Sequence, residues 1–149
     1  MAVGYGASLF RTFGSRMAGM SAISTFAAPE SPAMISYRHA MSIYAPELAD
    51  PSDEVATSSY VATDEMLQGL QLAGSCPTRT AFVDKLRHVT DFTGSGITAP
   101  VDLAKPKEPV LCENFVKADP SRNSFATVQP PAALDHHGFW CGQALSNHS

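Results

Sequence analysis

The sequence predicts an α/β fold, with α+β as the alternative, whose β-sheet is incomplete within this chain. Three middle segments have helix starts and apolar side chains at helical spacing. A short apolar segment before them predicts a strand, and two extended segments follow them. A strand must pair with a neighbour, and the later strands are distant in sequence. Partner strands are therefore expected to be missing from these residues.

The clearest element is the stretch from Pro51 to Gly74, which predicts one long helix. Ser52 is a suitable N-cap, acidic residues follow it in the first turn, and Gly74 is a suitable C-cap. Gly69 lowers helix propensity by about 1 kcal/mol relative to alanine, so we expect a neighbouring element to approach it closely. Apolar and small residues recur at helical steps and predict a broad face that a sheet should cover, namely Val55, Tyr60, Ala62, Met66, Leu67, Gly69, Leu70 and Ala73.

Three elements are predicted before this helix. Gly6 to Phe13 predicts a short helix, and Gly19 to Thr25 predicts a buried strand. Ser31 is an N-cap before a first-turn proline, and it predicts a second helix that ends near Ala45. One face of this helix could contact a cofactor, but core packing is the preferred interpretation for its side chains Met34, Tyr37, Met41 and Tyr44.

The segments after the long helix predict one more helix and then extended chain. Thr78 caps that helix, and its inward side chains are expected to be Phe82, Leu86 and Val89. Ile97 to Leu103 contains a proline and predicts an edge strand or an extended loop. Val110 to Lys117 and Phe125 to Val128 predict an antiparallel hairpin. The residues from Pro130 onward are expected to be irregular and to lie on the surface.

Composition narrows the class of protein. The 149 residues predict one domain, 44% of them are hydrophobic, and the formal net charge is -4, so neither a disordered tail nor a nucleic-acid partner is indicated. No apolar run approaches the roughly 20 residues needed to cross a bilayer. The first apolar stretch is broken by Arg11, Gly14 and Arg16, so no convincing signal peptide is expected.

The cysteines and histidines give no strong sign of a metal site. Cys76, Cys112 and Cys141 are widely spaced and form no CxxC pair, so one disulfide with a free thiol and buried free cysteines both stay open. His136 and His137 lie close to Cys141 and have the residue types of a metal site, but adjacent histidines point in different directions. We expect no metal, no cofactor and no catalytic residues.

Several stretches together resemble one family. The run SSYVATDEMLQGLQLAG, then CPTRTAFVDKLRHVTDFTGSGITAPVDL and LCENFVKAD, looks like the C-terminal part of the solute-binding proteins of branched-chain amino-acid ABC transporters. These are the type I periplasmic-binding, or leucine-binding-like, proteins. The earlier GYGASLFRTFG and MAGMSAISTFAAPES are similar to that family's preceding helix and strand. The resemblance covers residues 4–128 and leaves residues 129–149 as a tail.

The resemblance implies a partial type I periplasmic-binding fold, made mainly of second-lobe helices and C-terminal strands. The full-length family consists of two lobes that close around an amino acid or related small solute, and a membrane permease of the ABC transporter receives it. Its members are periplasmic or are lipid-anchored outside the cell. By this resemblance the chain covers only the C-terminal portion, and the strands of the first lobe are absent.

Two positions are implied as ligand contacts. Val55 matches a position where several family members have an aromatic residue that closes over the ligand, although valine offers less contact area. Phe26, at the exit of the early strand, is expected to face the cleft, and a structural role beneath the next helix is the alternative. Tyr60 belongs to the recognisable pattern and is expected to be structural.

Two classes of function follow. The first is the solute-binding component, or a truncated remnant, of an ABC-type uptake system. The second is a small interaction protein that self-associates as a homodimer through an exposed sheet edge. An enzyme has the weakest support, since no serine lies in a nucleophile motif.

Overall fold

The structure is a computed structural model, and it describes residues 7–122 and 124–144. The beginning of the predicted family region, residues 4–6, and the end of the predicted tail lie outside these ranges. The boundary that we place between residues 128 and 129 stays a prediction.

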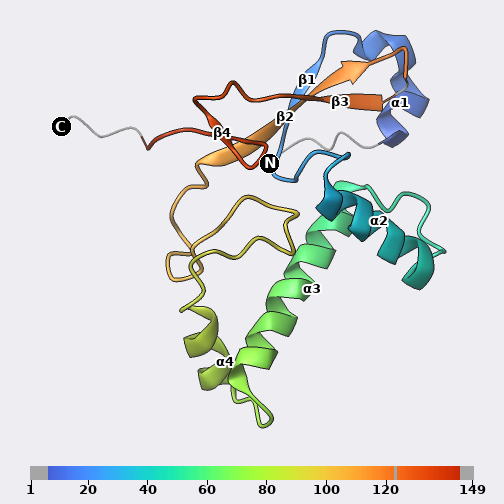
Figure 1. The fold of residues 1–149 in the computed structure, drawn as a ribbon. Helices are drawn as coiled ribbons and strands as arrows, with labels where there is room; N and C mark the ends of the chain where they lie inside the picture. The colour runs from blue at the N-terminus through green and yellow to red at the C-terminus, as the bar shows by residue number, and fades with distance from the viewer. Residues whose placement is uncertain (1–6, 123, 145–149) are drawn as a thin grey trace.

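The described residues form helices first and most of the strands last, in the order that the sequence predicts (Figure 1). The elements are α1 (Ala7–Phe13), η1 (Gly14–Met17), β1 (Ser21–Ser24), α2 (Pro32–Tyr44), α3 (Glu54–Ala73), α4 (Arg79–Leu86), β2 (Cys112–Asp119), β3 (Ser124–Val128), β4 (Asp135–His136) and β5 (Phe139–Cys141).

Strand β2 is the centre of the sheet, and every strand pair in the described residues is antiparallel. Strand β2 pairs with β1, from Ser21 opposite Lys117 to Ser24 opposite Asn114. It also pairs with β3, and these two strands form the predicted hairpin. Its first two residues pair with β5, and β5 pairs with β4. The sheet lies at one end of α3, whose remaining length runs beside α4 and loops (Figure 1). The predicted partial α/β fold with an incomplete sheet is confirmed. The expectation that the early strand lacks a partner is wrong, because β1 pairs with β2 although the two are distant in sequence.

The main core lies where the exit of β1 meets α2 and the loop after α4. Its buried side chains are Phe26, Ala27, Met34, Tyr37, Ile97, Ala99 and Phe139. Buried polar groups align the chain here: the Asn114 Nδ2 donates to the Phe26 carbonyl over 2.9 Å, and the Phe26 N–H donates to the Ser24 hydroxyl. A second, smaller cluster joins Phe10 and Met17 to Ala118.

The predicted helix starts are confirmed in two cases and wrong in the third. The Ser31 hydroxyl accepts from the Met34 N–H over 3.2 Å, and the Thr78 hydroxyl accepts from the Ala81 N–H over 3.1 Å. Helix α3 is capped by Asp53, not Ser52, because the Asp53 carboxylate accepts from the Val55 N–H in the first turn. Either residue suits the role by type, and the path of the preceding loop decides between them.

The apolar face of α3 is not covered by a sheet, which corrects the expectation from its sequence. Val55 is 73% exposed and Met66 is 50% exposed. The side that packs against the rest of the chain contains a different series at helical spacing, namely Thr57, Val61, Asp64 and Gln68. The exposed apolar series, which we call the α3 stripe, consists of Val55, Ala62, Met66 and Leu70. Of the predicted face, Tyr60 and Gly69 thus pack against the rest of the chain, and the α3 stripe faces outward.

Three further expectations are corrected. Strand β1 is shorter than predicted and half-exposed, since Ile23 points to solvent with 49% exposure. Tyr44, expected to face the core, is 83% exposed at the end of α2. The residues after Pro130 are not irregular throughout, because His137 and Gly138 adopt positive φ angles and form the turn of the β4–β5 hairpin.

The cysteines are resolved as one disulfide and one free thiol. Cys112 and Cys141 lie opposite each other in the β2–β5 pair and are bonded. Cys76 is free and exposed, so the alternative of buried free cysteines is wrong.

The close approach expected at Gly69 is confirmed by the ring of Phe82 on α4. A Cβ atom at Gly69 would lie 2.4 Å from the nearest carbon of that ring, a distance at which the ring must move. The glycine therefore allows α3 and α4 to pack side by side.

We predict that Gly69→Ala lowers the free energy of unfolding by about 1 kcal/mol, since overpacking costs roughly 1–3 kcal/mol and the gain in helix propensity offsets about 1. In a Phe82→Ala background the same change should instead stabilise the protein by about 1 kcal/mol, because the clash is gone. Urea denaturation of the four proteins measures both effects. The same sign in both backgrounds would contradict the packing argument.

Candidate functional site

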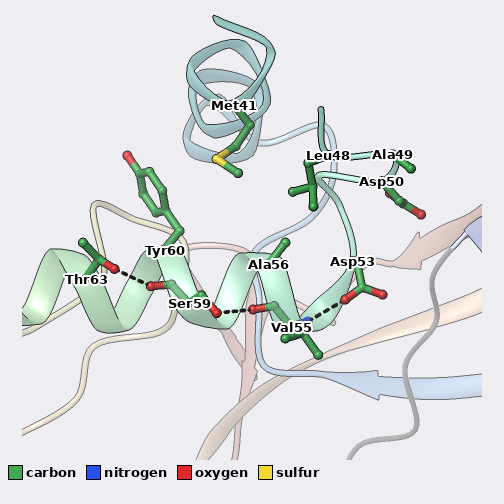
Figure 2. A pocket seen from close by; sticks show the side chains of 10 residues that line it. All are labelled: Met41, Leu48, Ala49, Asp50, Asp53, Val55, Ala56, Ser59, Tyr60 and Thr63. Atoms are coloured by element: carbon green, nitrogen blue, oxygen red, sulfur yellow. Dashed lines mark hydrogen bonds between the residues drawn. The ribbon is translucent and has the colours of Figure 1, made fainter. Parts of the chain in front are cut away.

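A cavity of about 690 Å³ lies between the end of α2, the loop after it and the first turns of α3 (Figure 2). This volume is within the roughly 300–1,000 Å³ of small-molecule sites. Its lining is mostly apolar: Met41 from α2, Leu48, Ala49, Asp50 and Asp53 from the loop, and Val55, Ala56, Ser59, Tyr60 and Thr63 from α3. We call it the α2–α3 pocket.

Tyr37 fixes the loop that borders this pocket. Its ring is 1% exposed, and its hydroxyl donates to the Pro51 carbonyl over 2.5 Å. The ring also meets Tyr60 edge to face, with centroids 4.9 Å apart. Burial raises the pKa of the Tyr37 phenol above its ordinary value, so the hydroxyl stays a donor at neutral pH. One side chain of α2 therefore holds both the loop and α3 in place.

The serine and threonine hydroxyl groups of α3 that line the pocket are already satisfied within the helix. The Ser59 hydroxyl donates to the Val55 carbonyl over 2.7 Å, and the Thr63 hydroxyl donates to the Ser59 carbonyl over 2.8 Å (Figure 2). Each bond spans four residues, the usual pattern for Ser and Thr inside a helix. The wall that α3 presents is consequently less polar than its sequence suggests.

The charged groups at the pocket are all acidic. Asp53 caps α3 by accepting from the Val55 N–H over 2.9 Å, and one oxygen of Asp50 accepts from the Ser52 N–H. The second oxygen of Asp50 is buried and has no hydrogen-bond partner among the described residues. Among the described residues, no lysine, arginine or histidine lines the pocket. A ligand here would meet apolar surface and negative charge.

The structure separates the two predicted ligand contacts. Val55 lies on the pocket wall and is largely exposed, as contact with a solute requires. Phe26 is 6% exposed within the main core and does not line this pocket. Tyr60 packs on Tyr37, in accord with a structural role, and also borders the pocket. Both ligand contacts stay predictions.

Sequence reasoning missed the loop of residues 45–53 as a part of the site. Leu48, Ala49 and Asp50 have no periodicity or motif that marks them. A weak signal exists in the prolines at both ends of the loop, Pro46 and Pro51, which limit its conformations. What brings the loop to α3 is the distant Tyr37 hydroxyl, and a linear pattern does not reveal such a contact.

The His136, His137 and Cys141 set does not form a metal site in the structure. Both histidines are exposed, and the Cys141 sulfur is bonded to Cys112. Within residues 7–122 and 124–144, no group of three or more His, Cys, Asp or Glu side chains is arranged to hold a metal ion. In the same ranges, every helix is too short or too polar to cross a bilayer.

An incomplete α/β fold with an open apolar pocket between two helices has the features of a ligand-binding module. A family model described as "Periplasmic binding protein" matches residues 1–122. The match spans most of the 149 residues, so the chain belongs to the periplasmic binding protein family. No curated protein and no solved structure was found to match it.

Family membership supports a general role in solute binding and transport, with a small solute and a transporter as partners. It indicates a periplasmic or extracellular location. Proteins of this family typically bind their solutes without transforming them.

We predict that Tyr37→Phe lowers the free energy of unfolding by about 1 to 3 kcal/mol, because it leaves the Pro51 carbonyl without its donor. Tyr44→Phe is the matched control, since that side chain is 83% exposed and should change nothing measurable. Urea denaturation followed by circular dichroism compares them. Equal stabilities of the two variants would show that the Tyr37 hydroxyl does not hold the loop.

Proposed function

We propose that this polypeptide is the C-terminal portion of a leucine-binding-like solute receptor that serves an ABC-type uptake system for an amino acid or a related small solute. It is proposed to act without catalysis and to deliver its solute to a membrane permease. The observation that favours this proposal most is the exposed α3 stripe, together with the family match over residues 1–122.

The α3 stripe supports the view that polypeptide outside these residues completes the fold. Exposure of Val55, Met66 and Leu70 along a 20-residue helix leaves apolar surface in water. Because apolar burial contributes about 25 cal/mol per Å², such a face is normally covered in the working protein. The strands expected of the first lobe and of the start of the second lobe are the proposed cover.

The α2–α3 pocket supports the assignment of Val55 as a solute contact. Apolar lining from Met41, Leu48 and Val55 suits an aliphatic side chain, and the nearby carboxylates suit an ammonium group. No basic side chain in the part of the chain that the structure describes lines the pocket to receive a ligand carboxylate, so that anchor is proposed to come from the first lobe. Phe26 is proposed to act at the exit of β1, beneath the closed cleft.

The alternative is a small interaction protein that self-associates through an exposed sheet edge. The charge of α3 disfavours a dimer built on the α3 stripe. The helix contains Glu54 and Glu65 outside the packed series and no basic residue, so two copies would bring like charges together. A dimer is therefore expected to use the free edge of β1, which is half-exposed.

We predict that Met66→Lys/Leu70→Lys leaves the helix content unchanged and reduces both aggregation and binding of the apolar dye 8-anilinonaphthalene-1-sulfonate. The reason is that both side chains already face water in the isolated chain. Ser58→Lys/Gln71→Lys is the matched control, because it adds the same charge at exposed polar positions of α3. Loss of helix in the first variant alone would contradict an uncovered α3 stripe.

We expect the isolated chain to bind leucine, isoleucine or valine too weakly for detection by titration calorimetry, because the first lobe is absent. Micromolar or tighter binding would contradict the proposal. Light scattering after size exclusion separates the two classes: a folded dimer favours the interaction protein, whereas aggregation favours the incomplete receptor. An in-frame first lobe in the coding DNA upstream of Met1 would support the receptor directly.

A further inference from the structure

The C-terminal hairpin, residues 135–141 with strands β4 and β5, lies beyond the residues that match the family and still contributes to the main core. Phe139 is 4% exposed and belongs to the same buried cluster as Phe26 and Tyr37. The adjacent Trp140 donates its indole N–H to the Val128 carbonyl over 2.8 Å and meets the ring of Phe115 edge to face. This short segment therefore closes one side of the core.

The non-covalent attachment of the C-terminal hairpin is small. Only two residue pairs join β5 to β2, and only two join β5 to β4. A two-stranded hairpin of this length is marginal by itself in water. Apart from Phe139, its side chains are half-buried or exposed. The hairpin thus depends on one buried ring, a few hydrogen bonds and the disulfide.

The disulfide joins the last residue of β5 to the first residue of β2. Cys112 and Cys141 are directly opposite, their Cα atoms are 4.0 Å apart, and the Gly142 N–H donates to the Leu111 carbonyl beside them. The bond closes a loop across 29 residues that contains β3 and the C-terminal hairpin. Closing a loop of that size removes conformational freedom from the open state.

The surroundings of this bond are partly open. Cys112 and Cys141 are both half-buried, not fully enclosed. Cys112 also lines two cavities of about 240 Å³ each, one beside Lys105 and Leu111 and the other beside Thr25 and Ala99. Accessible disulfides are the ones that exchange readily with external thiols.

We propose that the Cys112–Cys141 disulfide is a redox-controlled clasp: when oxidised it holds the C-terminal hairpin on the core, and a dithiol reductant releases the hairpin and uncovers the site of Phe139. The helices α2 and α3 are expected to keep their structure in both states, because the Tyr37–Tyr60 ring contact and the Tyr37–Pro51 hydrogen bond lie outside the hairpin, although both cysteines pack against the main core. This proposed release of the hairpin does not depend on which solute the protein binds.

The chemistry is a two-electron exchange. A thiolate of the reductant attacks one sulfur of the pair, the S–S bond breaks, and the other cysteine leaves as a thiolate that takes up a proton. The second thiol of the reductant then attacks the mixed disulfide and frees the remaining cysteine. The reductant ends as its own cyclic disulfide, and Cys112 and Cys141 end as thiols.

The single tryptophan of the chain, Trp140, reports on the clasp directly. In the full chain with Cys76→Ser, which removes the third thiol, dithiothreitol should shift the Trp140 emission to longer wavelength. It should also make the chain susceptible to chymotrypsin after Phe139 and Trp140, with no loss of far-UV helix signal. Reoxidation should reverse both changes. Cys112→Ser/Cys141→Ser in the same background should behave as the reduced protein without any reductant.

Two outcomes would overturn the clasp. Unchanged Trp140 emission and unchanged protease resistance, with mass spectrometry finding both thiols free, would mean that Phe139 alone retains the hairpin. Loss of the helix signal on reduction would mean that the disulfide holds the entire fold and does not control a local segment.

Discussion

The buried hydrogen bonds around Phe26 connect the sheet to the helices, and the rest of the arrangement depends on them. The Asn114 side chain of β2 donates to the Phe26 carbonyl, and the Ala27 N–H donates to the Ile97 carbonyl over 2.6 Å. Because an unsatisfied buried donor or acceptor costs about 1–3 kcal/mol, these groups determine where the chain leaves β1. Ser31 follows a few residues later, so they also set where α2 begins.

Helix α3 faces two different environments. Toward the chain it presents Thr57 and Gly69, which allow close contact with α2 and with Phe82 of α4. Toward solvent it presents the α3 stripe. An ordinary amphipathic helix has the reverse arrangement, with its most apolar side inward. The exposure of this stripe supports the proposal that further polypeptide covers it, and the chain belongs to the periplasmic binding protein family.

The loop beside the α2–α3 pocket is held by Tyr37, and the C-terminal hairpin packs into the main core that contains Tyr37. Tyr37 positions the loop through Pro51, and it shares its cluster with Phe139 of the hairpin. A change at the hairpin therefore acts on the same buried cluster that supports the pocket. The proposed redox clasp and the proposed solute site thus share one buried cluster, and they are tested by separate measurements.

Local features were predictable from the sequence because they depend on nearby residues. The caps at Ser31 and Thr78, the end of α3 at Gly74 and the β2–β3 hairpin all follow from residue types within a few positions. The close contact at Gly69 was predictable for the same reason, since a glycine inside a helix needs a compensating neighbour.

What only the tertiary structure decided is which surfaces meet. Periodicity identified the α3 stripe as apolar but could not tell whether this chain supplies its cover, because burial depends on residues distant in sequence or absent from it. The pairing of Cys112 with Cys141 and the hydrogen bond from the Tyr37 hydroxyl to the loop beside the pocket are likewise contacts across longer separations. Sequence spacing alone does not define such contacts, since they exist only once β2, β5 and the helices are placed together.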